Sequence, residues 1–200
     1  MIDDAIRDAA VRVLDACRLR GLTVATAESC TGGLVAGALT EIPGSSDVVD
    51  RGFVTYSDAA KEAMLGVPGA TLAQHGAVSR ETADAMAAGA LAMSTVHIAV
   101  AITGIAGPGG GSAEKPVGLV HFAAAARDGR ILHRECRFGA IGRTTVRQRS
   151  VVEALRMLME LARGPQPSTK PHREATSRLR PRLARSPRRT AVKRRRPTRA

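Results

Sequence analysis

Apolar and polar residues alternate along the first 163 residues with the periods of helices and strands. Residues 2–17 carry apolar side chains three and four positions apart, which predicts an amphipathic helix stopped by Gly21. Short runs rich in β-branched residues predict strands over residues 22–27 and 48–56. The same patterns predict helices over 34–39, from 57, over 79–91 and over 145–163, and strands over 96–102, 117–126 and 131–137.

The order of these elements predicts the fold class. Helices and strands alternate, and the last two strands flank the turn Arg127-Asp128-Gly129-Arg130, which is typical of a hairpin. Parallel connections followed by a hairpin give a mixed sheet with helices on both faces. The sequence therefore predicts an α/β protein, a three-layer α/β/α sandwich with a mixed sheet.

The net charge of +12 is concentrated at the C-terminal end. From Arg163 to Ala200 there are fourteen Lys or Arg residues against one acid, Glu174, whereas the first 162 residues hold sixteen bases and seventeen acids. This segment also contains six of the ten prolines and no aromatic residue. We therefore expect one domain over residues 1–163 and a disordered basic tail over 164–200. The tail would bind polyanions non-specifically, and an extension without a selected role explains its composition equally well.

Composition also excludes several classes of protein. No stretch approaches the roughly 18 apolar residues of a membrane-spanning helix, and the acidic N-terminus is unlike a signal peptide, so a cytoplasmic protein is expected. An aromatic content of 2% argues against a platform for stacking bases. The cysteines lack the spacing of a disulfide framework or zinc site, so we expect reduced thiols and no metal; they are Cys17, Cys30 and Cys136.

A serine at a strand-to-helix turn is the first candidate for chemistry. Ser29 follows the predicted strand and is succeeded by Cys30-Thr31-Gly32-Gly33, so backbone N–H groups concentrate around its hydroxyl. Such a turn suits an oxyanion or a phosphate. An ordinary helix N-cap serine is the alternative interpretation.

A lysine and a tyrosine follow the second predicted strand. Lys61 lies about one helical turn after the Tyr56-Ser57-Asp58 segment, so its amine and the Tyr56 hydroxyl could face one cleft. A desolvated lysine amine can act as a base toward a serine. The alternatives are a solvated surface lysine and a tyrosine packed on its strand.

A glycine-rich loop and two arginines complete the candidates. The segment Thr103 to Ser112 is rich in glycine, which permits close approach of the backbone to a ligand, and Lys115 could close over it. Arg143 and Arg147 are spaced to share one helix face and to grip a phosphate. A mobile turn and a solvated helix surface are the alternatives.

Several ordered blocks of this sequence resemble the nicotinamide-nucleotide amidase family, also called the CinA C-terminal domain family. They cover about residues 5 to 162. The matching blocks are Thr26-Ala27-Glu28-Ser29-Cys30-Thr31-Gly32-Gly33, Gly52-Phe53-Val54-Thr55-Tyr56-Ser57 with Lys61, Leu72-Ala73-Gln74-His75-Gly76-Ala77-Val78-Ser79, Thr103-Gly104-Ile105-Ala106-Gly107-Pro108 and Lys115-Pro116-Val117-Gly118.

The resemblance implies a serine amidohydrolase that converts nicotinamide mononucleotide to nicotinate mononucleotide and ammonia in pyridine nucleotide salvage. It implies Ser29 as nucleophile, Lys61 as its base and Tyr56 as a supporting hydroxyl, with no cofactor and no metal. It also implies a nucleotide substrate and a homodimer. The residues expected to contact the substrate are Glu28, Cys30, Thr31, Gly32, Gly33, Thr103, Gly104, Gly107, Gly110, Gly111, Lys115, Arg143 and Arg147.

The chain departs from the family pattern at two places. The family usually shows a Gly-Asp-Arg turn before the last helix, whereas this chain has an extra residue and no acid between Phe138 and Arg143. The basic tail is the other departure. Because few residues precede the first predicted helix, we expect the stand-alone form of the domain. A catalytically inactive nucleotide-binding or partner module is the alternative function.

Overall fold

The computed structural model describes residues 2–164, so the predicted tail beyond Gly164 lies outside the described residues. None of the helices in this described part combines the length and apolar character needed to cross a membrane. The elements in chain order are α1 (Asp4–Arg18), β1 (Val24–Glu28), α2 (Leu34–Thr40), the 3-10 helix η1 (Ser45–Asp47), β2 (Val49–Val54), α3 (Asp58–Leu65), α4 (Gly69–His75), α5 (Arg80–Ala92), β3 (Ile98–Gly104), β4 (Leu119–Ala126), β5 (Ile131–Arg137) and α6 (Arg143–Arg163).

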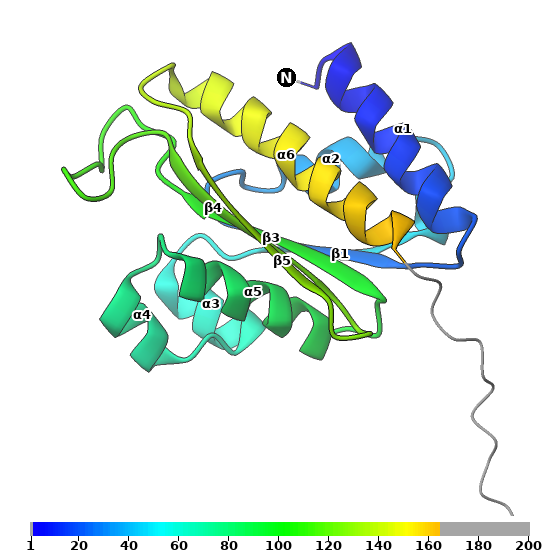
Figure 1. Cartoon of the computed structure of the whole chain (residues 1–200), viewed down its shortest axis with the longest axis horizontal. Coiled ribbons are helices and arrows are strands. Elements are labelled where there is room, and N and C mark those ends of the chain that lie inside the picture. The colour runs from blue at the N-terminus through cyan, green and yellow to red at the C-terminus, as the bar shows by residue number, and fades with distance from the viewer. Residues whose placement is uncertain (1, 165–200) are drawn as a thin grey trace, which may run out of the picture. The chain divides into compact units, whose positions relative to one another are not determined.

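The five strands form one mixed sheet in the order β2-β1-β3-β4-β5. Strand β1 runs parallel to β2 and β3, while β4 is antiparallel to both β3 and β5. Helices α1, α2 and α6 cover one face of the sheet, and α3, α4 and α5 cover the other (Figure 1). The predicted three-layer α/β/α sandwich with a mixed sheet is therefore confirmed.

Each face of the sheet has its own apolar core, because successive strand residues point to opposite faces. Val24 of β1 packs in the cluster that contains α1 and α6, whereas Ala25 and Ala27 pack in the cluster that contains α5. Small residues dominate the second face, so α5 can approach closely. At Gly89 of this helix a Cβ atom would lie 2.0 Å from the Leu65 carbonyl oxygen.

The structure corrects the predicted elements at two places. The sequence pattern did not predict α4, whose one buried side chain, Leu72, is too little to produce a visible helical period. Helix α6 begins at Arg143, two residues earlier than predicted. Helices α3 and α5 begin next to the predicted starts at residues 57 and 79, and Ser57 and Ser79 are their N-caps, since their hydroxyls accept from the N–H groups of Ala60 and Thr82.

Strands β1, β2 and β3 end at the same edge of the sheet, which we call the carboxyl edge. From β1 the chain crosses one face through α2 to reach β2, and it returns to β3 across the other face through α3, α4 and α5 (Figure 1). The chain thus leaves β1 and enters β3 from opposite sides of the sheet. In open α/β sheets such a switch point between neighbouring strands opens a crevice where ligands bind.

A buried carboxylate holds the turn between β1 and α2. Glu28 is fully buried, and its two carboxylate oxygens accept hydrogen bonds from the backbone N–H groups of Gly33, Val35 and Ala36 at 2.9–3.1 Å. The hydroxyl of Thr26 donates a fourth bond at 3.1 Å. The first N–H groups of a helix lack intrahelical partners, and an anion at this position satisfies them. Glu28 therefore sets the direction of α2 and the shape of the Ser29 turn.

We expect the substitution Glu28→Gln to lower the free energy of unfolding by roughly 2–3 kcal/mol, because an amide lacks the charge that strengthens these bonds. Urea denaturation followed by circular dichroism measures this loss. Glu41→Gln is the matched control, since the Glu41 carboxylate is 53% exposed and pairs with Arg7 at 3.8 Å. That variant should change stability by less than about 1 kcal/mol. Equal losses in the two variants would contradict the capping role of Glu28.

Candidate active site

Ser29 stands directly after β1 at the carboxyl edge and is 9% exposed. Its N–H donates to the carbonyl of Ile102 in β3 at 2.9 Å, and its carbonyl accepts from the N–H of Gly32 at 3.0 Å. The backbone is thus fixed on both sides. The Ser29 hydroxyl has no hydrogen-bond partner among the described residues, so it is available to a substrate.

The turn after Ser29 leaves two N–H groups available. Gly32 N–H donates to Ser29 and Gly33 N–H donates to Glu28. Within the described part of the chain, the N–H groups of Cys30 and Thr31 meet no acceptor oxygen. Two neighbouring N–H donors beside a free serine hydroxyl form an arrangement that can bind an oxyanion.

Arg147 of α6 binds two backbone carbonyl groups of this turn. Its Nε donates to the Cys30 carbonyl at 3.1 Å and its Nη2 donates to the Thr31 carbonyl at 2.8 Å. A peptide C=O and its N–H point in opposite directions. By binding the Cys30 carbonyl, Arg147 therefore directs the Thr31 N–H away from the helix.

Lys61 lies on the adjoining corner, between β2 and α3. Its side chain is 1% exposed, and its Nζ lies 3.5 Å from the carbonyl oxygens of Tyr56 and Ser57 and 3.3 Å from Oδ1 of Asp58. The amine therefore points back toward the start of α3, at the carboxyl edge. The described contacts of this amine do not include Ser29.

The chain nevertheless places these two corners side by side. Thr55 N–H donates to the Glu28 carbonyl at 2.8 Å, so Thr55 lies next to the residue that precedes Ser29. The buried hydroxyls of Thr31 and Thr55 have no partner among the described residues. Unpaired buried hydroxyls are rare and gather where a ligand or water completes them. We call the Ser29–Gly33 turn, the Thr55–Ser57 segment and Lys61 the Ser29 corner.

Tyr56 and the predicted arginines meet at the rim of the Ser29 corner. The Tyr56 ring is 62% exposed, and its hydroxyl accepts from Nη2 of Arg143 at 3.1 Å. Nη1 of Arg143 donates to the Gly107 carbonyl at 3.1 Å. Arg143 thus joins Tyr56 to the glycine-rich loop, and the extra residue before α6 does not prevent this contact.

The predicted contact residues of the glycine-rich loop serve the packing of the loop itself. A Cβ at Gly104 would lie 2.8 Å from the Leu119 carbonyl, one at Gly107 2.6 Å from Val117, and one at Gly111 2.8 Å from the Val117 nitrogen. The hydroxyl of Thr103 donates to the Ala77 carbonyl at 2.6 Å. Gly110 has a φ of +85°, which favours glycine whatever the space around it.

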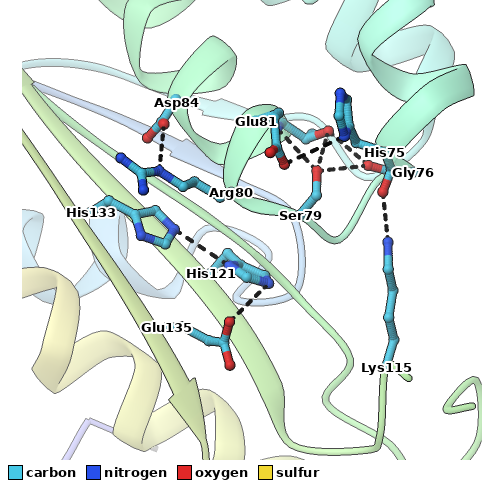
Figure 2. Close-up of polar contacts among 11 residues, drawn as sticks. His75, Gly76, Ser79, Arg80, Glu81, Asp84, Lys115, His121, His133 and Glu135 are labelled. Carbon is cyan, nitrogen blue, oxygen red and sulfur yellow. Dashed lines mark hydrogen bonds and ion pairs between the residues drawn. The ribbon is translucent and has the colours of Figure 1, made fainter. Parts of the chain in front are cut away.

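Lys115 points away from the glycines, toward the end of α4. Its Nζ donates to the His75 carbonyl at 2.6 Å (Figure 2). The same view shows His121 of β4, whose Nδ1 lies 3.4 Å from Nε2 of His133 on β5. Burial chiefly lowers the pKa of the His121 ring. Nearby Glu135 opposes this shift, and the charges of His133 and Lys115 add to it.

Two histidines, His75 and His121, line the same cavity as Lys115, and a third, His133, adjoins His121. His75 Nδ1 lies 3.7 Å from the carboxylate of Glu81, and His121 is paired with Glu135 at 4.0 Å (Figure 2). The register of the β4–β5 hairpin sets His121 opposite Glu135 and diagonally across from His133. This register is the feature of the sequence that could have revealed the histidine pair. Within residues 2–164, no three His, Cys, Asp or Glu side chains gather closely enough to hold a metal ion.

Fold and site together define an α/β protein with a serine-centred site at the carboxyl edge of its sheet. The CinA C-terminal domain family matches residues 6–162. The chain belongs to this family.

The chain matches known proteins over nearly their whole length. The chain is 51% identical over 161 residues to the nicotinamide-nucleotide amidohydrolase PncC of Escherichia coli K12, covering 80% of this chain and 96% of that protein. It is 48% identical over 155 residues to the enzyme of the same name from Enterobacter agglomerans, with coverage of 78% and 94%. The crystal structure of the competence/damage inducible protein CihA of Agrobacterium tumefaciens superposes with a TM-score of 0.79 at 60% identity, covering 80% of this chain and 98% of that one.

Cys30, next to Ser29, is a second potential nucleophile. Burial raises the pKa of the Cys30 thiol to about 12, so it is a thiol rather than a thiolate at neutral pH. We expect Cys30 to resist Ellman's reagent at pH 8 in the native protein and to react once urea unfolds the chain. Mass spectrometry of the labelled peptides measures this, with half-buried Cys136 as the internal comparison. Rapid native labelling of Cys30 would contradict the assignment of a neutral thiol.

Proposed function

We propose that this protein is a nicotinamide-nucleotide amidohydrolase that converts nicotinamide mononucleotide to nicotinate mononucleotide and ammonia. The names of the full-length relatives support the reaction and its substrate class. The observation that carries the proposal is the free Ser29 hydroxyl beside the two available N–H groups of Cys30 and Thr31. A hydroxyl with adjacent oxyanion donors is what acyl transfer from a carboxamide requires.

In the first half of the reaction, Ser29 Oγ attacks the carboxamide carbon and its proton passes to Lys61 Nζ. The carbonyl oxygen becomes an oxyanion, which accepts from the N–H groups of Cys30 and Thr31. The C–N bond then breaks, and the leaving nitrogen takes the proton from Lys61 and departs as ammonia. A nicotinoyl ester on Ser29 remains.

In the second half, water attacks the ester carbon while Lys61 accepts a proton from it. The bond to Ser29 Oγ breaks and Ser29 recovers its proton from Lys61, so that nicotinate mononucleotide is released. For both halves the Lys61 amine has to leave Asp58 and turn toward Ser29 in its uncharged form.

The other residues in and around the Ser29 corner have distinct roles. Cys30 and Thr31 would contact the substrate through backbone N–H groups, while Glu28, Gly33 and Arg147 position the turn. Tyr56, held by Arg143, would stand as a hydroxyl at the entrance and support proton transfer. Arg143 would also keep the glycine-rich loop against this entrance.

We expect Ser29→Ala to lower kcat for ammonia release from nicotinamide mononucleotide by at least about a thousandfold, and Lys61→Met by about a hundredfold or more. The physical reasons are the loss of the nucleophile and the loss of the proton acceptor. Mass spectrometry of native protein quenched during turnover should find the nicotinoyl adduct on the peptide that contains Ser29.

Ser46→Ala is the matched control, because Ser46 is exposed and lies outside the Ser29 corner. Its rate should equal that of the native protein. Circular dichroism spectra of all variants separate lost chemistry from lost folding. If Ser29→Ala and Lys61→Met both fold and both keep the native rate, the catalytic assignment is wrong even where the reaction is right.

The homodimer and the cytoplasmic location expected from the sequence stay predictions, as does polyanion binding by residues 164–200. One described feature supports the last of these. Arg149, Arg156 and Arg163 are exposed and recur every seven residues on α6, so they form a basic row along this helix.

Removing residues 165–200 should leave ammonia release unchanged and abolish most binding to duplex DNA at low salt. Fluorescence anisotropy across a salt series measures the association constant for DNA. In the full chain, the logarithm of this constant should fall linearly with the logarithm of the salt concentration. Loss of amidase activity on truncation would show instead that the segment belongs to the folded domain.

A further inference from the structure

A cavity of about 440 Å³ lies on the α5 face of the sheet, between the α4–α5 junction and the outer strands. This volume is in the range of small-ligand sites. Its walls come from the α4–α5 junction, the loop before β4 and the outer strands. They include His75, Ser79, Glu81, Lys115 and His121 (Figure 2), and also Arg137.

The sheet aligns this cavity with Ser29. Glu28 pairs with Ile102, so the next residues, Ser29 and Thr103, are neighbours, and Thr103 pairs with His121. Ser29, Thr103 and His121 continue the alternation of residues that face α5. Neighbouring strands are about 4.8 Å apart, so Ser29 and His121 are separated by two spacings, on the order of 10 Å.

Lys115 carries the positive charge that is available in this cavity. Its ammonium donates to an uncharged carbonyl, that of His75, and pairs with no carboxylate among the described residues. The other cations of the cavity are neutralised, since Arg80 pairs with Asp84 at 3.4 Å and Arg137 with Glu135 at 2.7 Å.

The two carboxylates of the cavity have partners of their own. Glu114 accepts from the Ser112 hydroxyl at 3.0 Å, and Glu81 lies 3.7 Å from His75. They do not contact the Lys115 amine. An anion can therefore reach Lys115 by replacing a single hydrogen bond to a carbonyl.

Arg143 and Arg147 are less suited to bind a substrate phosphate. Arg143 donates to Tyr56 and Gly107, and Arg147 donates to Cys30 and Thr31. Their guanidinium groups hold the walls of the Ser29 corner together. A dianion bound to either would compete with these bonds.

We propose that the cavity around Lys115 binds the phosphate of a mononucleotide whose carboxamide lies at Ser29, with the Lys115 ammonium and the His121 ring as phosphate contacts. This inference rests on the proposed function, and it places the phosphate on the α5 side of the glycine-rich loop rather than at α6. The site discriminates nucleotides from nucleosides, because a nucleoside has no phosphate to replace the hydrogen bond between Lys115 and the His75 carbonyl.

Calorimetric titration of the Ser29→Ala protein tests this placement without turnover. The probes are nicotinamide mononucleotide and nicotinamide riboside, which differ by the phosphate. We expect the mononucleotide to bind at least about tenfold more tightly, the value of one charge-assisted hydrogen bond, and Lys115→Met in the same background to remove most of this difference. Inorganic phosphate should compete with the mononucleotide before the Lys115 substitution and not after it.

Arg130→Met is the control of equal charge, because Arg130 pairs with Asp128 in the hairpin turn at the opposite edge of the sheet. It should leave the ratio of the two affinities unchanged. The inference is overturned if Lys115→Met preserves that ratio, or if Arg143→Met abolishes it instead. The proposed function fails separately, if the native protein releases no ammonia from the mononucleotide while still binding it.

Discussion

The buried carboxylate of Glu28 is the interaction on which the rest of the site depends. It ends β1 and at the same time receives the first N–H groups of α2, so it joins a strand to a helix through side-chain atoms. A buried charge is unfavourable unless it is fully hydrogen-bonded, and here four donors surround it. The chain between the two elements is therefore forced into one tight path.

This path has a chemical consequence one residue further on. The N–H groups of Gly32 and Gly33 donate to Ser29 and Glu28 within the turn. The two preceding N–H groups, those of Cys30 and Thr31, therefore stay available to a ligand. Arg147 supports the same arrangement from α6, at the far end of the domain sequence. The two available N–H groups are thus a product of packing between segments more than a hundred residues apart, although they consist of backbone alone.

The sheet extends the site beyond the serine. Its parallel strands bring Ser29 and Thr103 side by side, and the antiparallel β4 adds His121 to the same row. The loop between β3 and β4 then carries Lys115 across to the end of α4. The Ser29 corner and the cavity around Lys115 are consequently two parts of the carboxyl edge, about two strand spacings apart.

The sequence by itself determined the order of elements, the three-layer class, the helix starts near Ser57 and Ser79, and the candidate role of Ser29. These depend on periodicity and on hydrogen bonds within a few residues, which local sequence contains. Tertiary structure alone decided that Glu28 serves the fold, that Arg143 binds Tyr56, and that Lys115 turns toward His75. Each of these contacts joins residues that are paired by crossovers and strand register rather than by spacing along the chain, and one short helix, α4, buries too little to leave a period at all.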